Sequence, residues 1–237
     1  MRTPLFLLLL FGLGLNKLIA QGDGPENTTQ GTGPVSGNFQ VLWQSYSEDE
    51  RIGAIVPPEK TGYNAYGNLR YNQGGFSAGF RYESYLNAVL GFPGRFKGSG
   101  IGYRFARYAS PSQNVDVTIG NFYEQFGSGI VLRSYEERAL GIDNAMDGVR
   151  IILRPIEGIQ IKTIYGKQRF DFDDGLINGD GIVRGIDGDL DLNALFSKKG
   201  GQDWKTKVNL GANFVSKFQA GGTIASDTLI LTLPENV

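Results

Sequence analysis

The chain has 237 residues with 23 basic and 24 acidic side chains, so its net charge is near zero and no nucleic acid or other polyanionic partner is implied. It contains neither histidine nor cysteine, which excludes a serine triad, a zinc centre with nitrogen and sulfur ligands, and disulfide bonds. Glycine, phenylalanine and tyrosine are abundant while the mean hydropathy is only -0.20, a combination typical of a membrane β-barrel, in which alternate residues face lipid.

The first 37 residues predict export. Residues 1–20 begin with a basic residue at Arg2, continue through an apolar run, and end on the small residue Ala20. The run is shorter than the roughly 20 residues of a transmembrane helix, so we interpret it as a cleaved signal peptide. Residues 21–37 are polar and rich in Gly, Pro and Thr, which predicts a flexible leader. Residues 38–237 are expected to form one β-barrel domain in the cell outer membrane.

Side chains alternate between apolar and polar along most of this domain, the pattern of antiparallel β-strands. Strands near residues 63 and 76 would form a hairpin that turns at Gln73-Gly74-Gly75. In the next strand, Ile101, Tyr103 and Phe105 are predicted to share one face. About ten strands are expected in all. They are placed at residues 39–46, 63–71, 76–83, 101–106, 115–120, 149–153, 159–165, 190–196, 205–218 and 227–233.

Two interpretations fit this alternation. A soluble antiparallel sandwich also alternates, and it would bind glycan or protein through exposed aromatics such as Trp43 and Trp204. Several runs nevertheless alternate over about nine to eleven residues, the length of a tilted membrane strand, and aromatic residues gather near their ends. We therefore predict an all-β, antiparallel transmembrane β-barrel. Because the last residues lack a terminal aromatic, we expect the chain to be part of a larger barrel.

The alternation breaks off after Gly120 and resumes near Arg150. Ser134 and Glu137 fit a capping box, and Gly141 fits a helix stop, so a short helix is predicted between them. Apolar residues beside the charges favour folding into the barrel lumen over a solvated external loop. The Glu136 and Glu137 pair carries no glycosidase geometry, and no enzymatic activity is expected. The charged residues predicted to line or plug the pore are Arg133, Glu136, Glu137, Arg138, Asp143, Asp147 and Arg150.

An acidic, glycine-rich stretch follows at residues 171–191. Asn178, Asp180 and Asp187 fall at positions 3, 5 and 12 of a calcium loop, but Leu176 occupies position 1 and cannot ligate the ion. A long surface loop is the interpretation we adopt, with these residues only a weak calcium candidate. No cofactor is expected.

The central stretch GNFYEQFGSGIVLRSYEERALGIDNAMDGVRI and the following ILRPIEGIQIKTIYGKQ resemble uncharacterised outer-membrane β-barrel proteins of Bacteroidota, a porin-like family of the domain-of-unknown-function kind. The resemblance implies the location and the fold but no activity. The expected function is a non-enzymatic, porin-like channel or a scaffold for cell-surface or secretion machinery. The expected partners are outer-membrane lipid, the barrel-assembly machinery and secretion or surface-complex proteins.

Overall fold

A computed structural model describes residues 34–93, 97–170, 172, 181–196 and 206–219, and the backbone of two further strands, β12 (Gly222–Ser226) and β13 (Leu229–Leu233). The predicted signal peptide, Asn178, Asp180 and Trp204 lie outside the described residues. None of the helices in the described part of the chain is long and apolar enough to cross a membrane.

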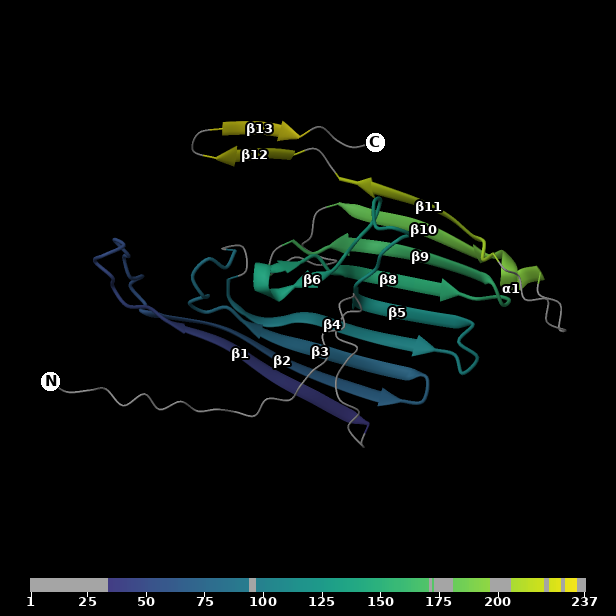
Figure 1. The fold of residues 1–237 in the computed structure, drawn as a ribbon, viewed down its shortest axis with the longest axis horizontal. Coiled ribbons are helices and arrows are strands. Elements are labelled where there is room, and N and C mark those ends of the chain that lie inside the picture. The colour runs from purple at the N-terminus through teal and green to yellow at the C-terminus, as the bar shows by residue number, and fades with distance from the viewer. Residues whose placement is uncertain are drawn as a thin grey trace.

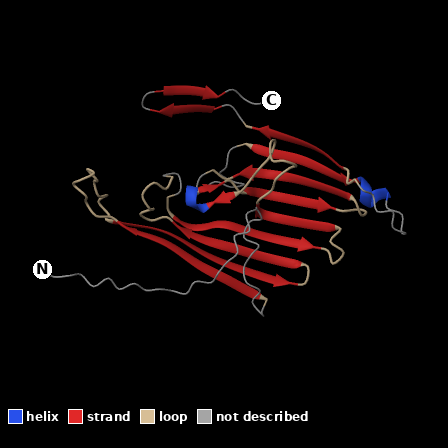
Figure 2. Ribbon diagram, viewed as in Figure 1, coloured by secondary structure: helices blue, strands red, loops and turns tan. Residues whose placement is uncertain are grey.

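The prediction of an all-β antiparallel fold is confirmed. Nine strands form one sheet in which each strand pairs with the next along the chain, in the order β1-β2-β3-β4-β5-β8-β9-β10-β11 (Figure 1). Figure 2 shows how little helix accompanies them. Among the described residues, β1 and β11 are not hydrogen-bonded to each other, so the sheet has two edges there. Its strands are β1 (Val35–Ser45), β2 (Thr61–Gln73), β3 (Phe76–Ser84), β4 (Ser99–Ala109), β5 (Val115–Phe122), β8 (Met146–Leu153), β9 (Ile159–Gln168), β10 (Ile182–Asp191) and β11 (Asn209–Phe218).

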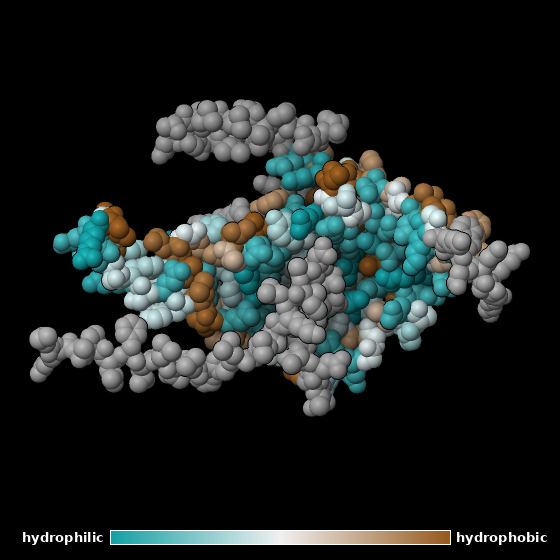
Figure 3. All heavy atoms as spheres, in the orientation of Figure 1, coloured by the Kyte–Doolittle hydropathy of each residue, from teal (hydrophilic) through white to brown (hydrophobic). Residues whose placement is uncertain are grey.

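The sheet has one apolar face and one polar face, and their exposure is the reverse of that in a soluble domain. On the apolar face, Phe39 is 72% exposed and Phe214 is 66% exposed. On the polar face, Arg81, Glu83 and Asp187 are buried. Charged residues are almost never fully buried in soluble proteins, whereas large apolar residues usually are. Figure 3 shows the side on which the polar residues gather, with hydrophilic side chains over much of its centre.

A β-bulge corrects the predicted faces of β4. Arg81 pairs with Tyr103 but Tyr82 pairs with Ile101, so Gly102 is an extra residue without a partner on β3. One extra residue reverses the direction of the side chains that follow it. Tyr103 is therefore buried on the polar face, while Ile101 is exposed on the other, and the prediction that they share a face is wrong. Phe105 follows Tyr103 to the polar face.

Several predicted elements differ from the structure. The long loop predicted over residues 171–191 is wrong for its second half, which is strand β10. The strand predicted over residues 190–196 is the end of β10 followed by a short helix, α1 (Leu192–Phe196). The Asp191 carboxylate accepts a hydrogen bond from the Ala194 amide at 3.0 Å, the pattern of a helix N-cap, which explains the change. β11 begins at Asn209 rather than near residue 205, and β1 begins inside the predicted leader. The strand predicted over residues 227–233 is one arm of a hairpin formed by β12 and β13.

Candidate functional site

Residues 123–145, between β5 and β8, fold back over the polar face of the sheet; we call them the insertion (Figure 1). They contain a two-stranded ribbon, β6 (Glu136–Glu137) and β7 (Ile142–Asp143), joined by the single 3-10 turn η1 (Arg138–Leu140). The insertion therefore lies where the charges that the sequence analysis singled out can meet the charges of the strands.

The helix predicted between Ser134 and Gly141 is wrong, apart from its end. Pairing of β6 with β7 removes Glu136 and Glu137 from any helix. The Ser134 hydroxyl is hydrogen-bonded to the backbone of Glu124 instead of capping a helix. Glu137 is the actual cap of η1, accepting from the Ala139 amide at 3.3 Å. Gly141 ends the turn in the left-handed region with a φ of 62°, as the sequence predicted.

Apolar side chains fix one part of the insertion to the sheet. Phe126 and Leu132 of the insertion are buried in a cluster with strand residues Phe122, Met146, Ile164 and Val183. Gly185 on β10 makes room for the Phe126 ring, because a Cβ atom there would lie 2.6 Å from its Cε2 atom. The close approach of the insertion to β10 thus depends on a glycine.

Buried ion pairs fix the other part, and we call this network the clamp: Arg81, Glu83, Glu136, Asp143 and Arg169. The Arg81 guanidinium of β3 donates to Glu83 at 2.6 Å, to Glu136 at 2.8 Å and to Asp143 at 3.1 Å. Arg169, which follows β9, donates to Glu83 and to Asp143, both at 2.8 Å. Two arginines from the wall of the sheet thereby hold two carboxylates of the insertion.

Hydroxyl groups complete the clamp. Tyr123 donates to Asp143 at 2.9 Å and Tyr85 donates to Glu83 at 3.2 Å. Burial raises the pKa of both tyrosines above the ordinary value, so both stay protonated donors at neutral pH. Burial also raises the pKa of Asp143, against the opposing effect of the Arg169 and Arg81 guanidiniums. A buried carboxylate is tolerated here because its oxygens accept several charge-assisted hydrogen bonds.

The structure brings some of the predicted site residues together and separates others. Glu136 and Asp143 belong to the clamp, and Arg138 extends it by donating to Glu136 at 3.0 Å and to Gln40. Arg133 is exposed above the Tyr135 ring. Asp147 lies 3.7 Å from the exposed guanidinium of Arg104, outside the clamp.

Three clamp residues were not predicted as site residues. Arg81 and Glu83 could have been found from the sequence, because they alternate with Phe80 and Tyr82 and so share the polar face of β3. Arg169 carried none, since it follows the last alternating residue of β9. Its partner Glu83 lies 86 positions earlier in the chain, so only the folded sheet brings the two together.

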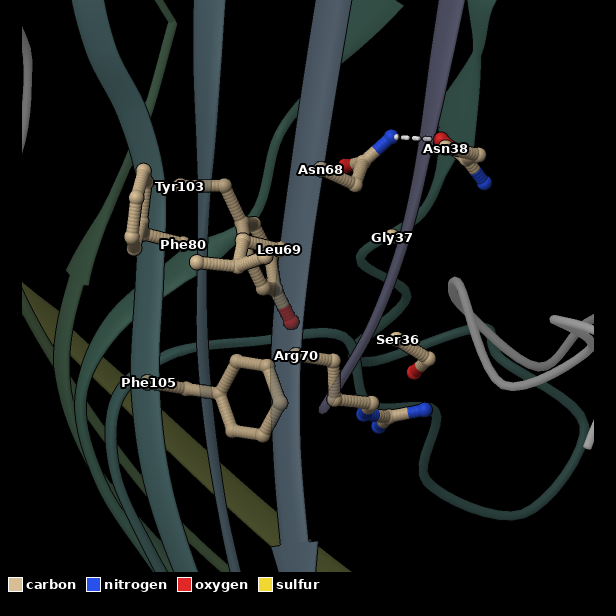
Figure 4. Close-up of a pocket in the computed structure, with 9 residues that line it drawn as sticks. All are labelled: Ser36, Gly37, Asn38, Asn68, Leu69, Arg70, Phe80, Tyr103 and Phe105. Carbon is tan, nitrogen blue, oxygen red and sulfur yellow. Dashed lines mark hydrogen bonds between the residues drawn. The ribbon is translucent and has the colours of Figure 1, made fainter. Parts of the chain in front are cut away.

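A groove of about 280 Å³ lies beside the insertion on the polar face; we call it the polar groove. Predicted site residue Arg150 lines it and contacts Glu124 at 3.3 Å. A small cavity of about 30 Å³ adjoins it and shares Arg70, Tyr103 and Phe105 with it (Figure 4). There the Arg70 guanidinium lies 5.2 Å from the centre of the Phe105 ring. Across the same cavity Asn68 donates to Asn38 at 2.6 Å, which joins β2 to β1.

Neither the clamp nor the groove resembles a metal centre. Within the described ranges, no group of three or more His, Cys, Asp or Glu residues could hold a metal ion. The weak calcium candidates Asn178 and Asp180 are outside those ranges. The third, Asp187, lies within β10 and pairs with Lys162 at 3.3 Å, so its carboxylate already has a cationic partner.

Comparison with known proteins gives the family but no activity. No curated protein and no solved structure matches the chain. A family model described as a family of unknown function (DUF6029) matches residues 2–235. The chain belongs to this family.

Proposed function

We propose that the chain forms part of the wall of a transmembrane β-barrel in an outer membrane, and that its insertion narrows the channel within. The observation that carries this proposal is the reversed exposure of the sheet: a continuous apolar face is open, and the charged face is covered. A lipid environment stabilises such an apolar face. In water, an exposed apolar face of this size would promote aggregation. A soluble sandwich would bury this face under a second sheet, yet it is open from β1 to β11 over the described residues.

Strand length supports the proposal. β1 and β4 have 11 residues, and β9, β10 and β11 have 10 each. A tilted transmembrane strand needs about 9–11 residues, while strands of globular proteins have a mode near five or six. These strands are long enough to cross the hydrocarbon core of a bilayer.

The connections between strands give independent support. At one end of the sheet the chain turns within residues 74–75, 110–114 and 154–158. At the other end the connections span residues 46–60, 85–98, 123–145 and 169–181. Outer-membrane barrels have short turns on the periplasmic side and long loops outside. We infer that the insertion and the clamp lie towards the extracellular end, and that the connection at residues 192–208 is a longer periplasmic one.

The polar face would then line the lumen. Its charges have partners in the sheet and the insertion, and the polar groove would be the space left between them. The insertion occupies the place of a constriction loop, since it leaves one strand and folds over the neighbouring strands from β3 to β10. This arrangement favours a narrowed channel.

Two measurements on the full-length protein test the proposal. Membrane fractionation, with unboiled and boiled samples compared on a denaturing gel, should place the protein in the outer membrane with a band that shifts on heating. In planar bilayers, deleting residues 128–142 should raise the conductance of the reconstituted protein. A soluble protein with no shift would refute the barrel, and equal absence of conductance before and after the deletion would refute the channel.

A further inference from the structure

We infer that the polar groove is a binding site for a small oxyanion, a carboxylate or a phosphate, and that the proposed channel favours anions at this point. The selectivity rests on the proposed function, whereas the binding site rests only on the groove itself. Three features carry the inference: the balance of charge, guanidinium donor atoms that bind no carboxylate among the described residues, and the size and lining of the site.

Cations outnumber carboxylates in the groove. Among the described residues that line it, the carboxylates are Asp116 and Glu124, and the cations are Arg70, Arg107, Arg150, Arg154 and Lys162. Asp187 adds a third carboxylate beside the groove, at 3.3 Å from Lys162, and cations still remain in excess. A cleft lined with an excess of one sign of charge focuses the field and raises the local concentration of the opposite ion.

The carboxylates are already neutralised by contacts within the wall. Asp116 accepts from the Arg107 guanidinium through both of its oxygens, with a shortest distance of 2.7 Å. Glu124 accepts from Arg150 and from Lys162, each at 3.3 Å. These carboxylates therefore do not repel an incoming anion as free charges would.

Two arginines retain capacity for an anion. Among the described residues, Arg154 donates only to neutral oxygens, the Gln160 side chain at 2.8 Å and the Gln113 carbonyl at 3.0 Å. The Nε atom of Arg150 is buried and has no hydrogen-bond partner among the described residues. An unsatisfied buried donor on a charged group costs stability, and an oxyanion that accepts from it would recover that loss.

The lining limits the ligand to a small one. The volume of about 280 Å³ is just below the usual range of small-molecule pockets, which begins near 300 Å³. Aromatic residues Tyr103, Phe105, Phe122 and Tyr123 form part of the wall, so a short apolar portion next to the charged group can be accommodated. Tyr123 and Glu124 come from the insertion, and the site is complete only while the insertion is docked.

Calorimetric titration of the full-length, detergent-solubilised protein tests the site, with sodium phosphate and sodium succinate as separate ligands and sodium chloride as the reference. The two informative variants are Arg154→Gln, which removes a cation that pairs with no carboxylate in the described part of the chain, and Gln160→Glu, which adds a carboxylate beside Arg154. Arg51→Gln is the matched control, because it removes one positive charge from the connection between β1 and β2, at the opposite end of the sheet from the short turns.

We expect wild type and Arg51→Gln to bind phosphate or succinate with the same affinity. Each groove variant should bind the ligand about tenfold more weakly, because the loss of one charge-assisted contact of about 1.4 kcal/mol changes the dissociation constant tenfold. The ligand that binds identifies the class of oxyanion. No binding of either ligand to wild type, or equal binding to all four proteins, would overturn the inference.

The same proteins separate this inference from the proposed function. Reversal potentials under a potassium chloride gradient should show anion preference in wild type and a shift towards cations in both groove variants. If the heat-shifted band and conductance are present but calorimetry detects no oxyanion, the barrel stands and the binding site is wrong. If oxyanion binding is present without a membrane-inserted barrel, the binding site stands and the proposed function is wrong.

Discussion

Replacing Arg81 by methionine tests whether the clamp holds the insertion in place. Arg81 is 1% exposed and contacts three carboxylates, so the substitution leaves Glu83, Glu136 and Asp143 with fewer cationic partners in a buried site. Breaking a buried ion pair by removing one partner costs about 3–5 kcal/mol. The matched control is Arg104→Met, because that guanidinium is 58% exposed and its contact to Asp147 is 3.7 Å long. An exposed pair contributes about 0–1 kcal/mol.

The expected result is a difference of at least about 2 kcal/mol between the two variants in the free energy of unfolding. It would be measured by urea titration in detergent, with the heat-shifted gel band as the signal. The insertion should also become accessible, since about 3 kcal/mol changes a docking equilibrium roughly a hundredfold. Trypsin should then cut at Arg133 and Arg138 faster in Arg81→Met than in Arg104→Met.

A double substitution separates charge from packing. Adding Glu83→Met to Arg81→Met removes the most buried of the three carboxylates that have lost Arg81 as a partner. The resulting apolar pair should recover part of the lost stability. Equal stability of Arg81→Met and Arg104→Met, with equal trypsin sensitivity, would refute the conclusion that the clamp secures the insertion.

Three further predictions use other parts of the molecule. Gly185→Ala should undock the insertion and increase trypsin cleavage, because the new Cβ atom would lie 2.6 Å from the Phe126 ring. Gly188→Ala should leave cleavage unchanged, because the nearest atom to its new Cβ would be 3.8 Å away. Equal cleavage of the two variants would contradict this prediction. Ile119→Lys on the apolar face should destabilise a membrane-inserted sheet by about 2–4 kcal/mol and leave a soluble one nearly unaffected, as measured by urea titration in detergent. Burial raises the pKa of Tyr85 and Tyr123, so both should ionise in the folded protein only well above about pH 10. Their contribution to the free energy of unfolding should be complete below about pH 10 and should be lost as the pH rises further. An ultraviolet titration would contradict this if replacing both tyrosines by phenylalanine removed no signal from the late-titrating tyrosines.

Local periodicity was sufficient to predict most of the sheet, because the side-chain period of two is a property of each strand alone. Phe76, Phe80 and Tyr82 alternate with Arg81 and Glu83 in the sequence, and the two sets lie on opposite faces of β3. The faces of β4 could not be predicted in the same way, since the bulge at Gly102 depends on the register with β3. Gly102 is also the point where the Glu83 carboxylate lies against the backbone, and a larger residue would displace it.

The insertion was predictable in direction but not in conformation. Its apolar residues, such as Leu132, indicated that it folds onto the sheet, and its Gly141 indicated where the turn ends. The competition between a capped helix and the β6–β7 ribbon was decided by Arg81 and Arg169, which bind Glu136 and Asp143 from strands far away in sequence. No local pattern contains that information.

The composition of the clamp also makes the position of the insertion depend on the whole middle of the chain. Its groups come from β3, from the insertion and from the residue that follows β9. Without Arg169, Glu83 and Asp143 would have only Arg81 as a cationic partner in the clamp. A truncated chain that ends before β9 would therefore contain the insertion but only half of the cations that hold it.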